Sequence, residues 1–328
     1  MKVYEAVIDQ LVGAGVEYFS GMVGSTSAPY AATLADRNDI RYVGVRHEQT
    51  AAAIIEATAR LSGKPGCLMI HGASGLLAAS AGIASAALDS TPMLVLSATQ
   101  ERRAMENGWW QTMNVLPPLS EVLKWQIRVE RPDQAVDAIR RALHETVSGK
   151  PGVAQVDLPI DVSTGDLDTG SPPVPAPRVA PMFRPLADPV AVDDTVSLLR
   201  NAARPVLLVG GGAVYSGAER VLIKLAERVH MPVVNTPTSR SAVRETHPLV
   251  MGPSGIVGYE PVGDAIREAD MILAIGSRLS DLQTARGDLL PDGIPIVQVD
   301  IDPAAVGRNH DVTVGIVADA RSFAGALN

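Results

Sequence analysis

Hydrophobic residues follow two patterns that alternate along the 328-residue chain. Short apolar runs, such as residues 93–98, are typical of buried parallel strands, whereas residues 3–14 repeat apolar side chains at near-helical spacing. This alternation favours an α/β fold with a parallel sheet covered by helices. Before residue 160 the pattern predicts strands at 16–20, 40–45, 67–70, 93–98, 125–129 and 154–158, and helices at 3–14, 30–35, 47–61, 73–88 and 134–147.

The pattern is interrupted at residues 163–189, which contain seven prolines and almost no apolar periodicity. Proline-rich segments are extended and semi-rigid, and they suit interdomain linkers. We therefore expect two doubly wound parallel-sheet domains, at residues 1–165 and 189–328, joined by a linker at 166–188. In the second domain the pattern predicts strands at 205–209, 233–234, 271–275 and 296–299, and helices at 190–202, 218–229 and 262–268.

Composition and charge exclude several classes of protein. Hydrophobic residues make up 46% of the chain and charged residues 20%, which is incompatible with a disordered protein. The formal net charge is −8, so a nucleic-acid partner is not expected. No apolar run approaches the roughly 20 residues that span a bilayer. The single Cys67 cannot form an internal disulfide, and we expect a cytoplasmic protein.

Three consecutive glycines, at positions 210–212, lie between a predicted strand and a predicted helix. The arrangement is similar to a dinucleotide-binding fingerprint, but Tyr215 stands where the third glycine of that fingerprint belongs. The next strand ends in Asn235 instead of an acidic residue that would bind a ribose. Two interpretations stay open: a tight strand-to-helix turn, or a nucleotide or flavin held by backbone amides.

Histidine and cysteine spacing predicts no metal site in this chain. The six histidines show no HxxxH or HxH pairing, and one cysteine offers no thiolate cluster. Glu48 is more informative, because it follows His47 where a predicted strand ends and an alanine-rich helix begins. On local pattern alone, the positive end of the helix dipole favours a carboxylate at this place.

Several segments resemble the thiamine-diphosphate enzymes of the acetolactate synthase, benzoylformate decarboxylase and pyruvate oxidase group, in the same order and spacing. In the first domain they are GMVGS (21–25), RHEQTAA (46–52), GKPG (63–66), HGASG (71–75), DSTPM (89–93) and KPGVAQVDLP (150–159). In the second domain they are ADMILAIGSR (269–278) and VDIDP (299–303). The resemblance covers essentially the whole chain and implies a pyrimidine-binding domain followed by a Rossmann-like central domain.

The resemblance implies that Glu48 is the catalytic glutamate that hydrogen-bonds the aminopyrimidine ring of thiamine diphosphate. A partly buried carboxylate facing a ring nitrogen can hold a shared proton there. That proton favours the imino tautomer, whose exocyclic nitrogen removes the thiazolium C2 proton. Further positions that the resemblance assigns to cofactor binding lie in the first and third loops of the domain: Gly21, Val23, Gly24, Gly72 and Ala73. Val23 stands where the family usually has proline.

Three other positions match active-site residues of the group. Ser25 and His71 match the serine and histidine of benzoylformate decarboxylase, which implies a substrate contact at Ser25 and a proton relay at His71. The alternative for His71 is a histidine that merely packs at the end of a strand. Gln111 matches the glutamine of a Phe-Gln pair and is expected to hydrogen-bond substrate. The alternative for Gln111 is a surface loop anchored by Trp109 and Trp110.

Members of the group also carry a third domain, whose Gly-Asp-Gly motif and asparagine ligands hold Mg²⁺ on the diphosphate. Three Gly-Asp pairs occur in this chain, at 165, 263 and 287, and none is followed by glycine. We therefore expect a second subunit to supply the diphosphate-binding domain and the Mg²⁺ ligands, in a heterotetramer with twofold symmetry. Alanine-rich helices at 51–59 and 73–88 are the expected packing surfaces.

The expected activity is that of a two-component thiamine-diphosphate enzyme acting on a 2-oxo acid. Decarboxylation and carboligation of the resulting acyl anion equivalent are both compatible with the sequence. Two alternatives stay open. One is a non-catalytic regulatory paralogue, against which the presence of Glu48 argues. The other is an enzyme that binds FAD or a nucleotide in its central domain, although FAD is not expected.

Overall fold

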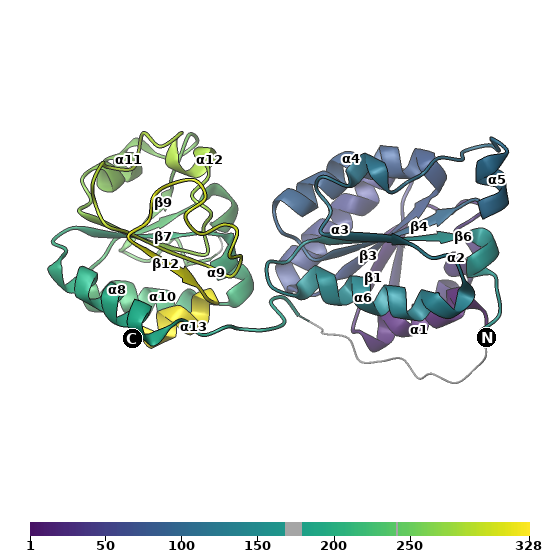
Figure 1. The fold of residues 1–328 in the computed structure, drawn as a ribbon, viewed down its shortest axis with the longest axis horizontal. Coiled ribbons are helices and arrows are strands. Elements are labelled where there is room, and N and C mark those ends of the chain that lie inside the picture. The colour runs from purple at the N-terminus through teal and green to yellow at the C-terminus, as the bar shows by residue number, and fades with distance from the viewer. Residues whose placement is uncertain (168–178, 241) are drawn as a thin grey trace. The chain divides into compact units, whose positions relative to one another are not determined.

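The computed structural model describes residues 1–167, 179–240 and 242–328 and contains two compact units (Figure 1). They are Met1–Met182 and Phe183–Asn328, and each is built around its own parallel sheet. The middle of the expected proline-rich linker, residues 168–178, lies outside the described residues. The division into units therefore falls within the segment that interrupts the hydrophobic pattern.

The first unit has a six-stranded sheet among its described residues, in the order β2-β1-β3-β4-β6-β5, and all neighbouring strands are parallel. The strands are β1 (Tyr18–Gly21), β2 (Arg41–Gly44), β3 (Gly66–His71), β4 (Met93–Thr99), β5 (Trp125–Arg128) and β6 (Val153–Pro159). The helices are α1 (Val3–Gly13), α2 (Ala28–Ala35), α3 (Glu48–Ser62), α4 (Gly72–Leu88), α5 (Arg102–Glu106), α6 (Ala135–Val147) and α7 (Ile160–Ser163). The strand order reverses direction between β1 and β3, which makes this the switch point of the sheet.

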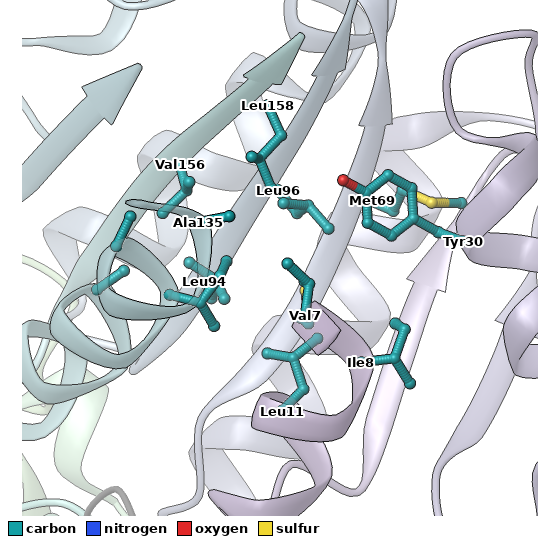
Figure 2. Packing of buried hydrophobic residues seen from close by; sticks show 14 of the residues in the cluster. Val7, Ile8, Leu11, Tyr30, Met69, Leu94, Leu96, Ala135, Val156 and Leu158 are labelled. Carbon is teal, nitrogen blue, oxygen red and sulfur yellow. The ribbon is translucent and has the colours of Figure 1, made fainter. Parts of the chain in front are cut away.

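Side chains that alternate along the strands give this sheet two hydrophobic cores. Leu94 and Leu96 of β4 lie in the core shared with α1 and α6, whereas Met93 and Val95 lie in the core shared with α3 and α4. Figure 2 shows the first of these cores, with Val7 of α1 directed toward the strands. Helices α3 and α4 therefore cover the opposite face of the sheet from α1 and α6.

The second unit has its own six-stranded parallel sheet among the described residues, in the order β12-β11-β10-β7-β8-β9. The strands are β7 (Pro205–Val209), β8 (Val233–Asn235), β9 (Val250–Pro253), β10 (Met271–Ile275), β11 (Ile296–Asp300) and β12 (Val314–Val317). The helices are α8 (Pro189–Asn201), α9 (Gly211–Ser216), α10 (Glu219–Val229), α11 (Glu260–Arg267), α12 (Asp281–Thr284) and α13 (Ala320–Ala326). This is the strand order of dinucleotide-binding folds, with the switch point between β7 and β10.

The predicted fold class is confirmed: both units are doubly wound α/β structures. Every predicted helix and strand is present, with its ends within two residues of the expected positions. The hydrophobic pattern missed β9, β12 and the short helices. β9 ends in Gly252 and Pro253, and Gly315 interrupts β12, so neither four-residue strand carries a readable run of apolar residues. No helix within the described ranges is long and apolar enough to cross a membrane.

Candidate functional site

The carboxyl ends of β1, β2 and β3 bring the predicted site residues of the first unit to one edge of its sheet. β1 ends at Gly21, β2 ends at Gly44 shortly before Glu48, and β3 ends at His71. Because the strands are parallel neighbours, these three ends lie side by side. In open α/β sheets, ligands bind at this edge beside the switch point, which here lies between β1 and β3.

Glu48 is the first residue of α3, and only 6% of its surface is exposed. The helix begins there because His47 caps it: the His47 backbone is extended, and its Nδ1 accepts a hydrogen bond from Gln49 N at 3.2 Å. The helix dipole favours the Glu48 charge at this position. Within the described part of the chain, no residue donates a hydrogen bond to the Glu48 carboxylate. Glu48 is therefore a largely buried residue whose carboxylate has no hydrogen-bond donor among the described residues.

Small residues on α4 make the space in which the Glu48 side chain lies. A Cβ built on Gly75 would lie 3.1 Å from Oε1 of Glu48 and 2.8 Å from Cγ2 of Ile70. Two turns later, a Cβ on Gly82 would lie 2.6 Å from Cβ of Ala52. These glycines let α3 and α4 approach closely, and they hold the carboxylate against the end of β3.

His71 is the last residue of β3, and its ring is held by the loop that follows β1. Nδ1 of His71 lies 2.6 Å from the hydroxyl oxygen of Thr26, which also donates a hydrogen bond to Ala98 O at 2.5 Å. The backbone of Gly24 lies directly against the ring, because a Cβ there would be 2.3 Å from Cγ of His71. The structure thus brings Gly24 and His71, two of the predicted residues, into contact.

Burial lowers the pKa of His71 below its usual value of 6.5. The side chain of Gln111 and the negative charge of Glu48 both act in the opposite direction, but burial has the larger effect on the pKa. His71 is therefore neutral near pH 7. A neutral imidazole beside a carboxylate has one nitrogen that can accept a proton from a bound molecule.

Gln111 reaches the same edge of the sheet from the long connection after β4. Its backbone has a φ of 58°, an uncommon conformation for a residue with a side chain. The Oε1 atom lies beside Gly72, 3.2 Å from the position of a built Cβ, and it is buried without a hydrogen bond of good geometry. Trp109 and Trp110 are 62% and 68% exposed, so they do not anchor this loop in the described structure.

Polar side chains from the sheet hold the segment that follows Gln111. Nε2 of Gln155, on β6, donates a hydrogen bond to Val115 O at 3.2 Å. Nη2 of Arg128, on β5, donates a hydrogen bond to Oδ1 of Asn114 at 3.3 Å. Hydrogen bonds from β5 and β6 therefore hold the segment that follows Gln111 in place.

The other predicted residues make no hydrogen bond with Glu48, His71 or Gln111 in the described structure. Gly21 is buried at the end of β1, where its carbonyl oxygen accepts a hydrogen bond from the Tyr42 hydroxyl at 3.0 Å. Val23 and Ser25 are exposed, and Ala73 is half-buried in the first turn of α4. The Ser25 hydroxyl makes no hydrogen bond with any residue that the structure describes.

Thr26 and Gly75 contact the predicted residues and were not predicted from the sequence. Their importance depends on which segments meet in space, since Thr26 joins His71 to β4 and Gly75 faces Glu48 from another helix. No local signal marks either residue. Among the described residues, no three His, Cys, Asp or Glu side chains are placed to hold a metal ion.

The second unit has a separate polar feature at the carboxyl edge of its sheet. Asn235 ends β8 and is fully buried, and neither its Oδ1 nor its Nδ2 has a hydrogen-bond partner among residues 1–167, 179–240 and 242–328. The buried hydroxyl of Ser254 also lacks a partner within these ranges. The glycine turn packs against Gly276, because a Cβ on Gly210 would lie 2.1 Å from Gly276 O. Close packing against Gly276 therefore explains why residue 210 is a glycine. It does not explain the buried side-chain amide of Asn235.

Comparison with known proteins matches two parts of the chain to one enzyme family. Residues 1–117 match the domain described as "Thiamine pyrophosphate enzyme, N-terminal TPP binding domain". Residues 192–327 match the domain described as "Thiamine pyrophosphate enzyme, central domain". Together the two matches cover most of the chain.

Similar proteins include acetolactate synthase large subunits. The chain is 32% identical to the probable acetolactate synthase large subunit of Methanocaldococcus jannaschii over 98% of its own length and 55% of that protein. It is 31% identical to the large subunit of Corynebacterium glutamicum, over 98% of this chain and 51% of that one. The sulfoacetaldehyde acetyltransferase of Rhodobacter capsulatus is 28% identical, over 99% of this chain and 54% of that one.

The chain thus spans about half the length of the curated relatives that it matches. Its two doubly wound parallel sheets agree with the two matched domains. On these grounds the chain belongs to the thiamine pyrophosphate enzyme family.

Proposed function

We propose that this chain supplies the pyrimidine side of a thiamine-diphosphate site in an enzyme that acts on a 2-oxo acid. The observation that carries the proposal is Glu48, a largely buried residue beside the switch point whose carboxylate has no hydrogen-bond donor among the described residues. A protonated ring nitrogen of an aminopyrimidine would satisfy this acceptor. The residues present therefore fit the pyrimidine half of the cofactor.

The chemistry divides between the cofactor and the chain. When bound, thiamine diphosphate supplies the nucleophilic carbon and the electron sink that decarboxylation needs. Glu48 holds a proton at the pyrimidine ring, in a buried place where the hydrogen bond is strong. His71 and Gln111 face the same edge, where the imidazole exchanges a proton with substrate and the amide orients a carbonyl or carboxylate.

We further propose that the reaction is of the acetolactate synthase type, in which decarboxylation is followed by ligation to a second carbonyl compound. The acetolactate synthase large subunits among the relatives support this choice. Decarboxylation alone stays the simpler variant. The two are distinguished by the products formed from pyruvate, because ligation yields a new carbon–carbon bond and decarboxylation alone yields an aldehyde.

The diphosphate side of the site is proposed to come from a second subunit with a Gly-Asp-Gly motif and Mg²⁺ ligands. An uncharged surface of α4 supports a protein partner: its 17 residues contain no Asp, Glu, Lys, Arg or His. Leu77 and Leu88 on this helix are 54% and 57% exposed. An uncharged helix with exposed leucines can be covered by a protein partner without leaving a charge buried and unpaired. A twofold heterotetramer would bury one such surface on each copy.

The test combines the purified chain with a polypeptide that carries the diphosphate-binding domain, thiamine diphosphate, Mg²⁺ and pyruvate. We expect release of CO₂ from the mixture and none from either protein alone. Turnover by the isolated chain would contradict the proposed division of the site. A mixture that assembles and binds cofactor but never consumes a 2-oxo acid would instead support a regulatory role.

A second candidate function rests on the second unit, which we consider as a nucleotide or flavin site. The Asn235 amide favours it, because it is buried without a described partner at the carboxyl end of β8 in a dinucleotide-type sheet. The test is equilibrium binding of FAD and of ADP to the purified chain, with Asn235→Ala as the variant. Binding that depends on Asn235 would establish the site, and absence of binding would leave the glycine turn as a purely structural feature.

A further inference from the structure

The hydroxyl of Thr26 lies between a carbonyl oxygen and a histidine nitrogen. Its oxygen is 2.5 Å from Ala98 O and 2.6 Å from Nδ1 of His71. Thr26 is buried, with 2% of its surface exposed, so water does not compete for these contacts. Both distances are those of strong hydrogen bonds.

Counting hydrogens fixes the direction of both bonds. A threonine hydroxyl carries one hydrogen, and a carbonyl oxygen can only accept. The hydrogen of Thr26 therefore points to Ala98 O. The contact with His71 is then a hydrogen bond only if Nδ1 carries the hydrogen and donates it to the Thr26 oxygen.

The surrounding backbone prevents the imidazole from moving away from this arrangement. Ala98 lies opposite His71 in the register of β4 and β3, so the carbonyl acceptor is fixed by the sheet. Gly24 packs against Cγ and Cδ2 of the ring, leaving no room for a shift toward the loop. The same short loop thus supplies both the surface that supports the ring and the hydroxyl that binds it.

We propose that Thr26 is a positioning residue that holds His71 in the Nδ1–H tautomer, so that Nε2 is the basic nitrogen of the site. The catalytic meaning of this proposal rests on the proposed function, whereas the tautomer belongs to the chain alone. In this state Nε2 can accept a proton from a bound molecule, and the resulting imidazolium keeps its Nδ1–H bond to Thr26. The charged group that faces His71 among the described residues is Glu48 of α3, and Gln111 is the neighbouring polar group from the loop.

The test is nitrogen-15 NMR of the full chain with labelled histidine, without cofactor, at a pH where His71 is neutral. The His71 signals are assigned by comparison with His71→Asn. We expect a protonated Nδ1 and an unprotonated Nε2. A wild-type spectrum in which Nε2 carries the hydrogen would overturn the proposal, and this measurement needs no Thr26 variant to fold.

Two matched variants separate the hydroxyl from the shape of the side chain. Thr26→Ser keeps the hydroxyl and is expected to keep the Nδ1–H tautomer. Thr26→Val keeps the shape and removes the hydrogen bond, so its His71 signal should move toward the Nε2–H form. An unchanged tautomer in folded Thr26→Val would also overturn the proposal.

In the mixture with the diphosphate-binding polypeptide, Thr26→Val should lower kcat/KM by about 10- to 100-fold and move its pH profile, as loss of an orienting partner does. Thr26→Ser should retain both. If the NMR result holds and the mixture is inactive even with wild-type chain, the proposed function fails while the tautomer stands. If the wild-type mixture is active but Thr26→Val keeps its rate and pH profile, the catalytic part of the inference is wrong.

Discussion

At the scale of single residues, the site holds a glutamate that is largely buried and has no hydrogen-bond donor among the described residues. The Glu48 carboxylate is held by Gly75 and the start of α3, and no described residue pairs with it. A carboxylate at the edge of the sheet with no protein partner can accept a hydrogen bond from a ligand.

We predict that Glu48→Gln changes the free energy of unfolding of the cofactor-free chain little. The substitution keeps the shape and removes a charge that the helix dipole favours but that no described residue pairs with, so stability should stay within about 1 kcal/mol of wild type. Urea unfolding followed by circular dichroism measures it. A loss of more than about 2 kcal/mol would show that the carboxylate has a structural partner after all.

Acid should destabilise the first unit partly through His71. Burial holds the pKa of His71 in the folded chain below the 6.5 of an exposed histidine, so the unfolded chain binds the proton more readily. The contribution of His71 to the free energy of unfolding is constant above about pH 6.5, where the residue is neutral in both states. Below that pH the free energy of unfolding falls, and the fall ends once the pH is below the lower pKa of His71 in the folded chain.

This prediction is checked by NMR titration of His71 and by unfolding at several pH values. His71→Asn should lose the part of the pH dependence between the two pKa values, because Asn does not titrate. A His71 pKa above 6.5 would reverse the sign and contradict the account.

At the scale of elements, the close approach of α3 and α4 determines where Glu48 lies. Gly82→Ala should destabilise the first unit by about 1–3 kcal/mol, because the new methyl would meet Ala52 at 2.6 Å. The matched control is Gly325→Ala in α13, where a built Cβ has nothing within 4 Å. There the better helix propensity of alanine should stabilise the second unit by up to about 1 kcal/mol. Denaturant unfolding of both variants distinguishes the outcomes, and equal effects would argue against close helix packing.

The elements themselves were largely predictable from sequence. β10 is an uninterrupted apolar run and β4 begins with four apolar residues. Helix α3 ends at Ser62, because the next residue, Gly63, has a left-handed φ of 69° that stops the helix. β9 and β12 were not predictable, because each has only four residues, with glycine or proline among them, and no readable apolar run.

The site was predictable only as far as family resemblance extends. Glu48, His71 and Gln111 were predicted from motifs, and the structure places all three at the same edge of the sheet. Their assigned roles stay predictions. Thr26 was missed because a threonine between two serines carries no local signal, and its partners are 45 and 72 residues away in the chain.

At the scale of the whole molecule, each unit has its own sheet and its own hydrophobic cores. We therefore predict that residues 1–182 fold without residues 183–328. Cys67 reports this directly, since it is buried in β3 and burial raises the pKa of its thiol. The thiol should resist Ellman's reagent equally in the fragment and in the full chain, and react once urea unfolds the first unit. Rapid labelling in the fragment alone would show that the second unit is needed for folding.

The central claim is that Glu48 acts on the pyrimidine ring of the cofactor, and hydrogen–deuterium exchange at C2 of bound thiamine diphosphate tests it most directly. The measurement uses the chain combined with the diphosphate-binding polypeptide and Mg²⁺, with wild type and Glu48→Gln compared by quenched-flow NMR. We predict exchange about 10²- to 10⁴-fold slower in Glu48→Gln, with assembly and cofactor content unchanged. Exchange at the wild-type rate in a fully loaded Glu48→Gln assembly would contradict the claim.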